Sequence, residues 1–200
     1  QRAYNQQPIS YMGGANDGFH EAIGDMIALS ITPEYLVQIG LLDKALVPSA
    51  DKDIGLLLRQ AMDKVAFLPF GLLIDKWRWG VFEGSISPQE YNQAWTKLRL
   101  DYQGITPPSE RPNDSFDAAA KYHIPGNTPY ARYFMARILQ FQFYEAACQL
   151  SGWKGPLHRC SFYGNKAVGE RLNAMLKLGS SKPWPEALQA FSSTSKMDGG

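Results

Sequence analysis

The stretch 53–79, with the sequence DIGLLLRQAMDKVAFLPFGLLIDKWRW, decides the fold class. Its apolar residues recur at the spacing of one face of an α-helix. They are Ile54, Leu57, Leu58, Ala61, Val65, Leu68 and Leu72. Pro69 stands inside this run, where its ring and its missing N–H predict a kink in the helix but not its end. The stretch therefore predicts a long, kinked amphipathic helix.

Helix-start signals continue on both sides of this stretch. A hydroxyl residue that can cap a helix, followed by a proline at the first helical position, occurs at Thr32–Pro33, Ser87–Pro88 and Thr128–Pro129. Glu90 completes a capping box with Ser87, and Gly40 is a left-handed stop. We predict helices over about 19–29, 32–40, 87–102, 129–151 and 164–178, and a short one from 183. Only 120–124, before Pro125, has strand character. The sequence predicts an all-α fold in one compact unit with no obvious linker.

Composition excludes several classes of function. Of the 200 residues, 44% are hydrophobic, and 20 basic against 19 acidic side chains leave a net charge of +1. A protein that binds nucleic acid or a membrane surface would show a basic excess, so we expect no nucleic-acid partner. No uninterrupted apolar run reaches the roughly 18 residues that a membrane span requires, so this chain is predicted to hold no transmembrane segment.

The chain has two cysteines, Cys148 and Cys160. Two thiols are too few for a zinc or iron–sulfur site built on cysteine alone. In an oxidising compartment they can close a short loop, whereas in the cytosol they would be two unpaired, buried thiols. Spacing and composition leave both alternatives open.

Two groups of residues have the chemistry of a functional site. In the first, Glu21 follows His20, and Asp25 lies one turn further along the same predicted helix. Two carboxylates on an otherwise apolar helix indicate a bound cation or a partner. The alternative is an acidic first turn that faces water and interacts favourably with the helix dipole.

The second group lies within 121–133. It holds Lys121, His123, Tyr130, Arg132 and Tyr133. Cations and phenols at the start of a helix, where backbone N–H groups also favour anions, suit a carboxylate ligand or a tetrahedral oxyanion. The alternative is a rim of amphipathic side chains whose rings pack while their polar ends stay in water.

Several longer segments resemble one known family. They are GANDGFHEAIGD at 14–25, IGLLD at 39–43, AFLPFG at 66–71, WRWGVF at 77–82, YQGI at 102–105, FQF at 141–143, GPLH at 155–158 and GSSKPW at 179–184. In this order they are similar to the angiotensin-converting enzyme family of zinc peptidyl-dipeptidases, over essentially the whole chain. The resemblance implies that 1–200 is the C-terminal portion of a large helical metallopeptidase domain with a deep central cleft.

The resemblance also implies roles for the first group. Glu21 matches the third zinc ligand, which follows the two histidines of the family's HExxH motif. Asp25 matches the carboxylate that orients a ligating histidine, and His20 matches a residue of the active-site wall.

Most of the second group matches substrate-binding positions. Lys121 and Tyr130 match the residues that hold the C-terminal carboxylate of the peptide. His123 and Tyr133 match the catalytic groups that hydrogen-bond the scissile carbonyl and stabilise the oxyanion. Phe67 and Phe70 match the walls of the pocket for the C-terminal side chain.

The remaining matches concern chloride and the cysteines. Arg132 matches the arginine of one chloride site, and Trp95 with Arg99 matches part of another. Cys148 and Cys160 match a disulfide pair. The disulfide implied by this match places the protein outside the cytoplasm, as a secreted, periplasmic or membrane-anchored ectodomain.

The chain departs from the family at two points. The HExxH motif would lie just before Gln1, and the first residue is not Met, so we expect the chain to be part of a longer protein. Arg137 stands where the family pattern predicts an aromatic residue of the pocket wall. The implied activity is zinc-dependent release of dipeptides from peptides with a free C-terminus. The alternative is an inactive fragment or relative that binds peptides or partners. We expect the isolated chain to hold little zinc, to be inactive and to form a homodimer through its exposed cleft surface.

Overall fold

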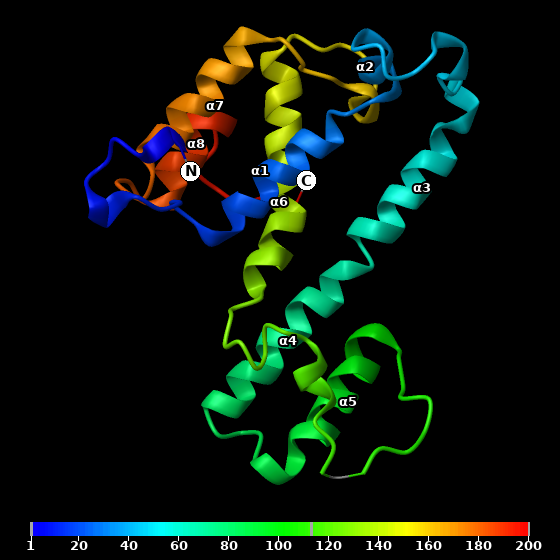
Figure 1. The fold of residues 1–200 in the computed structure, drawn as a ribbon, viewed down its shortest axis with the longest axis vertical. Helices are drawn as coiled ribbons and strands as arrows, with labels where there is room; N and C mark the ends of the chain where they lie inside the picture. Colours follow the sequence, from blue (N-terminus) through cyan, green and yellow to red (C-terminus); the bar gives the residue numbers. More distant parts are fainter. Residues whose placement is uncertain (1, 113, 200) are drawn as a thin grey trace. The chain divides into compact units, whose positions relative to one another are not determined.

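The structure is a computed structural model that describes residues 2–112 and 114–199 (Figure 1). Its α-helices are α1 (Asp17–Leu29), α2 (Pro33–Gln38), α3 (Asp53–Lys64), α4 (Phe67–Phe82), α5 (Tyr91–Gln103), α6 (Ala131–Leu150), α7 (Lys166–Leu178) and α8 (Trp184–Ser192). Short 3-10 helices connect them, among them η5 (Pro88–Glu90), η6 (Asp117–Ala120) and η7 (Leu157–Arg159). These ranges contain no strand, so the all-α prediction is confirmed. The segment 120–124, which has strand character in the sequence, forms no strand, because the end of η6 and turns occupy it.

The chain forms two compact units. Unit 1 consists of residues 1–60 and 135–200, and unit 2 consists of residues 61–134. The prediction of one compact unit is therefore wrong. Both boundaries fall inside continuous helices, α3 and α6. A helix that crosses a boundary has none of the Gly, Pro or Ser enrichment by which a linker is recognised in a sequence.

The stretch 53–79 forms two helices instead of one kinked helix. The α-helical pattern stops after Lys64 and resumes at Phe67, so Pro69 lies in the first turn of α4. A proline ring in a continuous helix would clash with the carbonyl of the residue four positions earlier, here Val65. In the first turn its missing N–H needs no partner within the helix. Because the break falls before the proline, neither the steric clash nor the missing hydrogen bond destabilises the helix.

Most of the predicted helix ends are confirmed. The Thr32 hydroxyl accepts a hydrogen bond from the Tyr35 backbone N–H at 3.2 Å. The Ser87 backbone N–H donates to the Glu90 carboxylate at 3.2 Å, which forms the capping box. Gly40 has a φ of +76°, as a left-handed stop requires. Local sequence signals therefore define these ends.

Unit 1 is built around the C-terminal part of α6. Phe143 of α6 is fully buried and packs edge-on against Phe19 of α1 and Phe191 of α8, with ring centroids 5.4 and 5.7 Å apart. Leu139 and Val168 belong to the same buried cluster. Aromatic burial of this kind gives the unit a hydrophobic core of its own.

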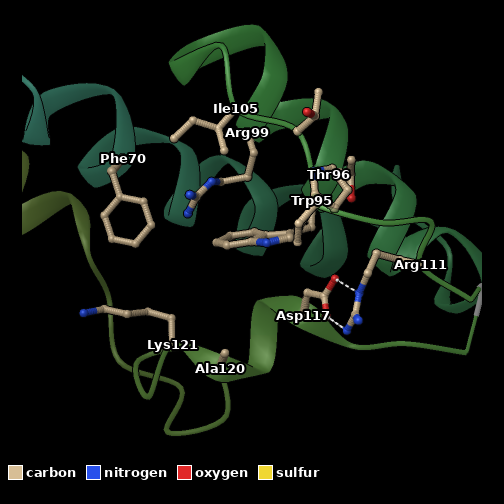
Figure 2. A pocket seen from close by; sticks show the side chains of 12 residues that line it. Phe70, Trp95, Thr96, Arg99, Ile105, Arg111, Asp117, Ala120 and Lys121 are labelled. Carbon is tan, nitrogen blue, oxygen red and sulfur yellow. Dashed lines mark hydrogen bonds and ion pairs between the residues drawn. The ribbon is translucent and has the colours of Figure 1, made fainter.

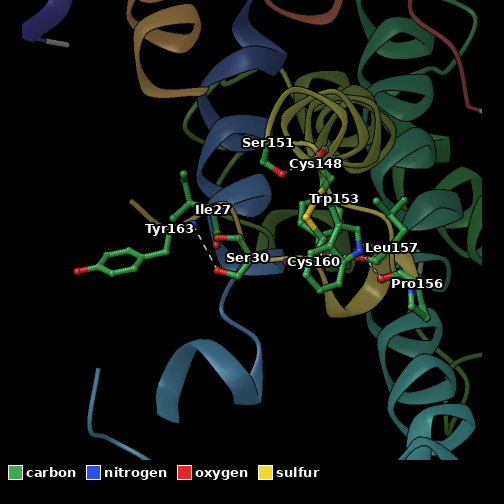
Figure 3. The surroundings of a disulfide bond; sticks show 11 residues. Ile27, Ser30, Cys148, Ser151, Trp153, Pro156, Leu157, Cys160 and Tyr163 are labelled. Carbon is green, nitrogen blue, oxygen red and sulfur yellow. Dashed lines mark hydrogen bonds between the residues drawn. A yellow bond between two sulfur atoms is a disulfide. The ribbon is translucent and has the colours of Figure 1, made fainter. Parts of the chain in front are cut away.

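The predicted disulfide is present in unit 1. Cys148 near the end of α6 is bonded to Cys160, which follows η7, with Cα atoms 6.2 Å apart (Figure 3). The Tyr144 hydroxyl lies 2.6 Å from the Cys160 carbonyl and 2.8 Å from the Leu157 carbonyl, and donates toward them. Burial raises the pKa of Tyr144 to about 12. The bridge and the buried phenol together fix the loop after α6.

A cluster of charged side chains also holds η7. Arg159 donates from Nε to Asp53 Oδ2 at 3.0 Å and from Nη1 to Glu34 at 2.6 Å. His158 Nε2 lies 2.8 Å from the same Asp53 oxygen. Hydrogen bonds from Arg159 and then His158 lower the pKa of Asp53 to about 2.

Unit 2 has a smaller core between α4 and α5. Its buried apolar residues are Leu73, Ile74, Trp77, Trp95, Ala118 and Tyr130. The Trp77 indole N–H donates to the Tyr91 carbonyl at 3.0 Å, which joins α4 to the start of α5. In the ranges that the structure describes, no helix is long and apolar enough to cross a membrane.

Candidate functional site

A carboxylate from α4 caps the N-terminus of α6 within unit 2. Asp75 Oδ2 accepts hydrogen bonds from the backbone N–H of Tyr130 at 2.8 Å and of Ala131 at 2.6 Å. Its other oxygen accepts from Arg78 Nη1 at 2.6 Å. Asp75 and Arg78 are 1% and 5% exposed, so this is a buried ion pair. The N-terminus of α6, which was predicted to favour a ligand anion, is therefore bound by the protein's own Asp75 carboxylate.

The predicted cap of α6 is consequently wrong. Thr128 does not accept a hydrogen bond from the helix; its hydroxyl donates to the Gly126 carbonyl at 3.2 Å. The helix begins at Ala131, two residues later than Pro129 predicts. Arg78 Nη2 also donates to the Asn127 side chain at 2.9 Å, which fastens this turn to α4. A contact across 55 residues replaces the local signal.

Three aromatic side chains of the second predicted group meet beside this cap. The His123 ring lies 4.7 Å from the Tyr130 ring and 5.4 Å from the Tyr133 ring, both edge-on. The two tyrosine rings are 4.8 Å apart. His123 Nε2 and the Tyr133 hydroxyl are 3.3 Å apart, within hydrogen-bond reach. The structure therefore pairs the two residues that were predicted to act on the scissile carbonyl.

The surroundings of His123 favour the neutral form of its imidazole. Burial lowers the pKa of its imidazole below the usual value of 6.5, and the positive charges of Lys121, Arg132 and Arg78 lower it further, while Asp75 opposes the shift. Its Nδ1 atom is buried without a hydrogen-bond partner in the described part of the chain. A neutral imidazole can donate from one nitrogen and accept at the other, which suits it to binding a polar group of a ligand.

Lys121 and Arg99 are cations that lie over aromatic rings. The Lys121 ammonium is 4.9 Å from the Tyr130 ring centre and 5.9 Å from that of Phe70. The Arg99 guanidinium is 5.3 Å from the Phe70 ring and 5.8 Å from the Trp95 ring. Cation–π contacts of this kind attract the cations without neutralising their charge.

Both cations line a pocket of about 470 Å³ (Figure 2). Its walls are Phe70, Trp95, Thr96, Arg99, Ile105, Thr106, Pro107, Pro108, Arg111, Asp117, Ala120 and Lys121. Within residues 2–112 and 114–199, neither Arg99 nor Lys121 has a carboxylate partner, whereas Arg111 is paired with Asp117. Apolar walls with unneutralised cations suit a ligand that carries both an anionic and an apolar group.

The predicted apolar walls adjoin the aromatic cluster. Phe67 and Phe70 are 6.2 Å apart, and each ring centre is 6.0 Å from that of Tyr130. Arg132, on the first turn of α6, lies close enough to His123 to lower its pKa. Unit 2 therefore contains all the predicted residues of the second group, with Trp95, Arg99, Phe67 and Phe70.

The first predicted group lies on α1 in unit 1. His20 and Glu21 are exposed. Asp25 accepts a hydrogen bond from Arg137 Nη1 at 2.7 Å, which joins α1 to α6. Arg137, which departs from the family pattern, thus pairs with the carboxylate that was predicted to orient a zinc-binding histidine. The resemblance implies that Glu21 and Tyr133 act in one active site, and this stays a prediction because the two residues belong to different units.

A zinc site cannot be assembled from the described residues alone. Over 2–112 and 114–199, no group of three His, Cys, Asp or Glu side chains is placed to hold a metal ion. Catalytic zinc generally uses three protein ligands, and Glu21, the one ligand predicted within this chain, offers a single carboxylate. The residues present therefore do not fit the ion without further ligands.

Sequence reasoning missed Asp75, Arg78, Arg111 and Asp117. A signal existed for the first two, because an Asp and an Arg three residues apart in the apolar run of α4 must be paired to be buried. No local signal indicated the other two, whose segment reads as a proline-rich surface loop.

Comparison with known proteins gives one consistent family. A family model described as angiotensin-converting enzyme matches residues 1–200. The chain is 54% identical to angiotensin-converting enzyme of Sus scrofa over 187 residues, which is 93% of this chain and 14% of that protein. It is 48% identical to angiotensin-converting enzyme of Theromyzon tessulatum over 195 residues, 97% of this chain and 32% of that protein.

A third relative is angiotensin-converting enzyme-like protein Ace3 of Mus musculus, 47% identical over 195 residues and covered to 26% of its length. The chain thus spans between 14% and 32% of the length of these three relatives. The family model matches all 200 residues, and the helical fold is consistent with this match. The chain belongs to the angiotensin-converting enzyme family.

Proposed function

We propose that this chain is the C-terminal part of the catalytic domain of a zinc peptidyl-dipeptidase, which releases dipeptides from the C-termini of peptides. The observation that carries the proposal is the grouping in unit 2 of two unneutralised cations, an apolar pocket and the His123–Tyr133 pair. Membership of the family supports it.

Lys121 and Tyr130 bind the terminal carboxylate of the substrate in this proposal. The Lys121 ammonium is held 4.9 Å above the Tyr130 ring, beside the walls formed by Phe67 and Phe70. Those walls receive the C-terminal side chain. A cation at a fixed distance from the bond to be cleaved sets how many residues lie between that bond and the chain end. This arrangement favours release of a fragment of constant length.

His123 and Tyr133 act on the scissile carbonyl. The phenol hydroxyl of Tyr133 donates a hydrogen bond to the carbonyl oxygen and strengthens it as negative charge develops there. Neutral His123, whose Nε2 lies 3.3 Å from that hydroxyl, orients the phenol by donating its one N–H to the phenol oxygen. The lowered pKa of His123 favours this neutral form.

Zinc supplies electrophilic polarisation of the carbonyl in this family. Glu21 would provide one ligand, and two histidines of an HExxH motif outside these 200 residues would complete the set. We further propose that chloride binds near Arg132 and near Trp95 and Arg99, which are 5.8 Å apart as cation and ring.

We place the protein outside the cytoplasm. The Cys148–Cys160 disulfide supports this, since such bonds persist in oxidising compartments. As an isolated piece, the chain would associate into a homodimer through apolar surface that a larger domain would cover.

A second candidate is an inactive relative that binds peptides or partners without cleaving them. The Arg137–Asp25 pair favours it, because it engages the carboxylate predicted to orient a zinc ligand. The two candidates differ in the HExxH motif, so sequencing the coding region before Gln1 separates them. The motif within about ten codons supports the enzyme, and its absence supports the binding protein.

The proposal is tested by kinetics of the full-length protein. Lys121→Ala should raise KM for a blocked tripeptide with a free C-terminus and leave KM for its C-terminal amide unchanged. Tyr133→Phe should lower kcat far more than it alters KM, because its hydrogen bond strengthens late in the reaction. Equal effects of Lys121→Ala on acid and amide would refute the role of the lysine.

A further inference from the structure

Arg111 differs from the other two cations of the pocket because its charge is already neutralised. Its Nε donates to Asp117 Oδ2 at 2.9 Å, and its Nη2 donates to the other oxygen, as the dashed lines of Figure 2 show. This two-point pairing raises the pKa of Arg111 and lowers that of Asp117. Arg111 is therefore poorly suited to bind a substrate anion, although it lines the same pocket as Lys121.

Asp117 also joins Arg111 to α5. The Asp117 backbone N–H donates to the Asn92 side-chain oxygen at 2.9 Å, and Asn92 Nδ2 donates to the Asp117 carboxylate at 3.3 Å. Asn92 is the second residue of α5 and is 5% exposed, so Asp117 is anchored to a buried side chain of this helix. Three segments consequently meet at Asp117: α5, η6 and the proline-rich loop, which carries Pro107, Pro108 and Arg111.

The η6 helix carries this anchor directly to Lys121. It runs from Asp117 to Ala120, and the Lys121 backbone N–H donates to the Ala118 carbonyl at 3.1 Å. Ala118 is fully buried, and Phe116 packs on the Trp77 ring at 5.7 Å. One turn of helix therefore fixes the backbone of Lys121 relative to Asp117.

We infer that Arg111 and Asp117 are positioning residues for Lys121, which set the ammonium at the place where it receives the substrate's terminal carboxylate. The inference rests on the carboxylate-binding role proposed for Lys121. Loss of the ion pair frees the proline-rich loop and loosens the start of η6, so the ammonium samples positions away from its seat over Tyr130. The defect should appear only with substrates whose carboxylate Lys121 binds.

The test compares variants of the full-length protein on a blocked tripeptide acid and on its C-terminal amide. Arg111→Gln and Asp117→Asn should each raise KM for the acid by about fivefold, with kcat within about twofold and KM for the amide unchanged. Arg111→Lys keeps the charge but not the two-point geometry, so its KM should fall between those of the parent and Arg111→Gln. Arg59→Gln is the matched control, since Arg59 is exposed on α3 in the other unit.

The outcomes separate the inference from the proposed function. Equal effects of Arg111→Gln on acid and amide would show that the pair only stabilises the loop. No effect of either variant, with a large effect of Lys121→Ala, would overturn the positioning role and leave the lysine assignment intact. No effect of Lys121→Ala would overturn both. If Arg111→Gln lowers the melting temperature more than Arg59→Gln does, the KM values of Asp117→Asn decide the question. In that variant the backbone N–H of residue 117 still donates to Asn92.

Discussion

Replacing Asp75 by asparagine should destabilise unit 2 and release the start of α6. The carboxylate accepts three hydrogen bonds, from Arg78 and from the backbone N–H groups of Tyr130 and Ala131, at 2.6 to 2.8 Å. An asparagine has the same shape but only one accepting oxygen. Its amide would leave at least one donor unpaired and the Arg78 charge buried without a counterion.

The magnitude follows from the burial of the pair. Removing one partner of a buried ion pair costs about 3–5 kcal/mol, because the other charge remains without compensation. Asp75 and Arg78 are 1% and 5% exposed, so solvent gives little relief. The matched control is Asp101→Asn, whose carboxylate pairs with Lys97 at 2.7 Å with side chains 44% and 73% exposed. An exposed pair of this spacing contributes about 0.3–0.5 kcal/mol.

The assay is urea unfolding followed by tryptophan fluorescence, to which Trp77 and Trp95 contribute from the core of unit 2. Amide hydrogen exchange at Tyr130 and Ala131 gives a local reading that does not depend on two-state unfolding. Both amides should exchange much faster in Asp75→Asn than in the parent. Adding Arg78→Met should recover part of the lost stability, since it removes the uncompensated charge.

Two results would refute this reasoning. One is a loss of stability for Asp75→Asn no larger than that for Asp101→Asn. The other is unchanged exchange at Tyr130 and Ala131, which would mean that the carboxylate does not cap α6 in solution.

Three other predictions concern unit 1 and the isolated chain. The pKa of Asp53 falls from 3.8 to about 2 on folding, so the stability that its carboxylate contributes is complete above pH 3.8 and is lost as the pH falls toward 2. In Asp53→Asn the melting temperature should therefore vary less with pH over this window. An unchanged fall of the melting temperature at acid pH would contradict the assignment. Replacing Cys148 and Cys160 by serine should cost about 3 kcal/mol of unfolding free energy in urea titrations, and a loss below about 0.5 kcal/mol would mean that the loop is fixed without the bridge. Metal analysis and light scattering of the purified 200-residue chain should find little zinc and a dimer; stoichiometric zinc, or a monomer at high concentration, would overturn the proposed dependence on further ligands and covering surface.

Sequence by itself determined most of the helical elements and the family. Capping residues such as Thr32 and Ser87 act on backbone groups within one turn, and apolar spacing reports a helix face, so both signals are complete within a short window. The disulfide, by contrast, followed from resemblance, because two cysteines alone left the bridged and unbridged states open. The group Lys121, His123, Tyr130, Arg132 and Tyr133 was singled out from the sequence with its role left open. Only the resemblance added Phe67, Phe70, Trp95 and Arg99 to it.

Only the tertiary structure decided how these residues are held. It divided the chain into two units through helices that carry no linker signal, and it moved the cap of α6 from Thr128 to Asp75, which is 55 residues from Tyr130. It also paired Asp25 with Arg137 across 112 residues. These partners were invisible in the sequence because a buried charge requires some counterion, while which one it receives depends on how distant helices pack.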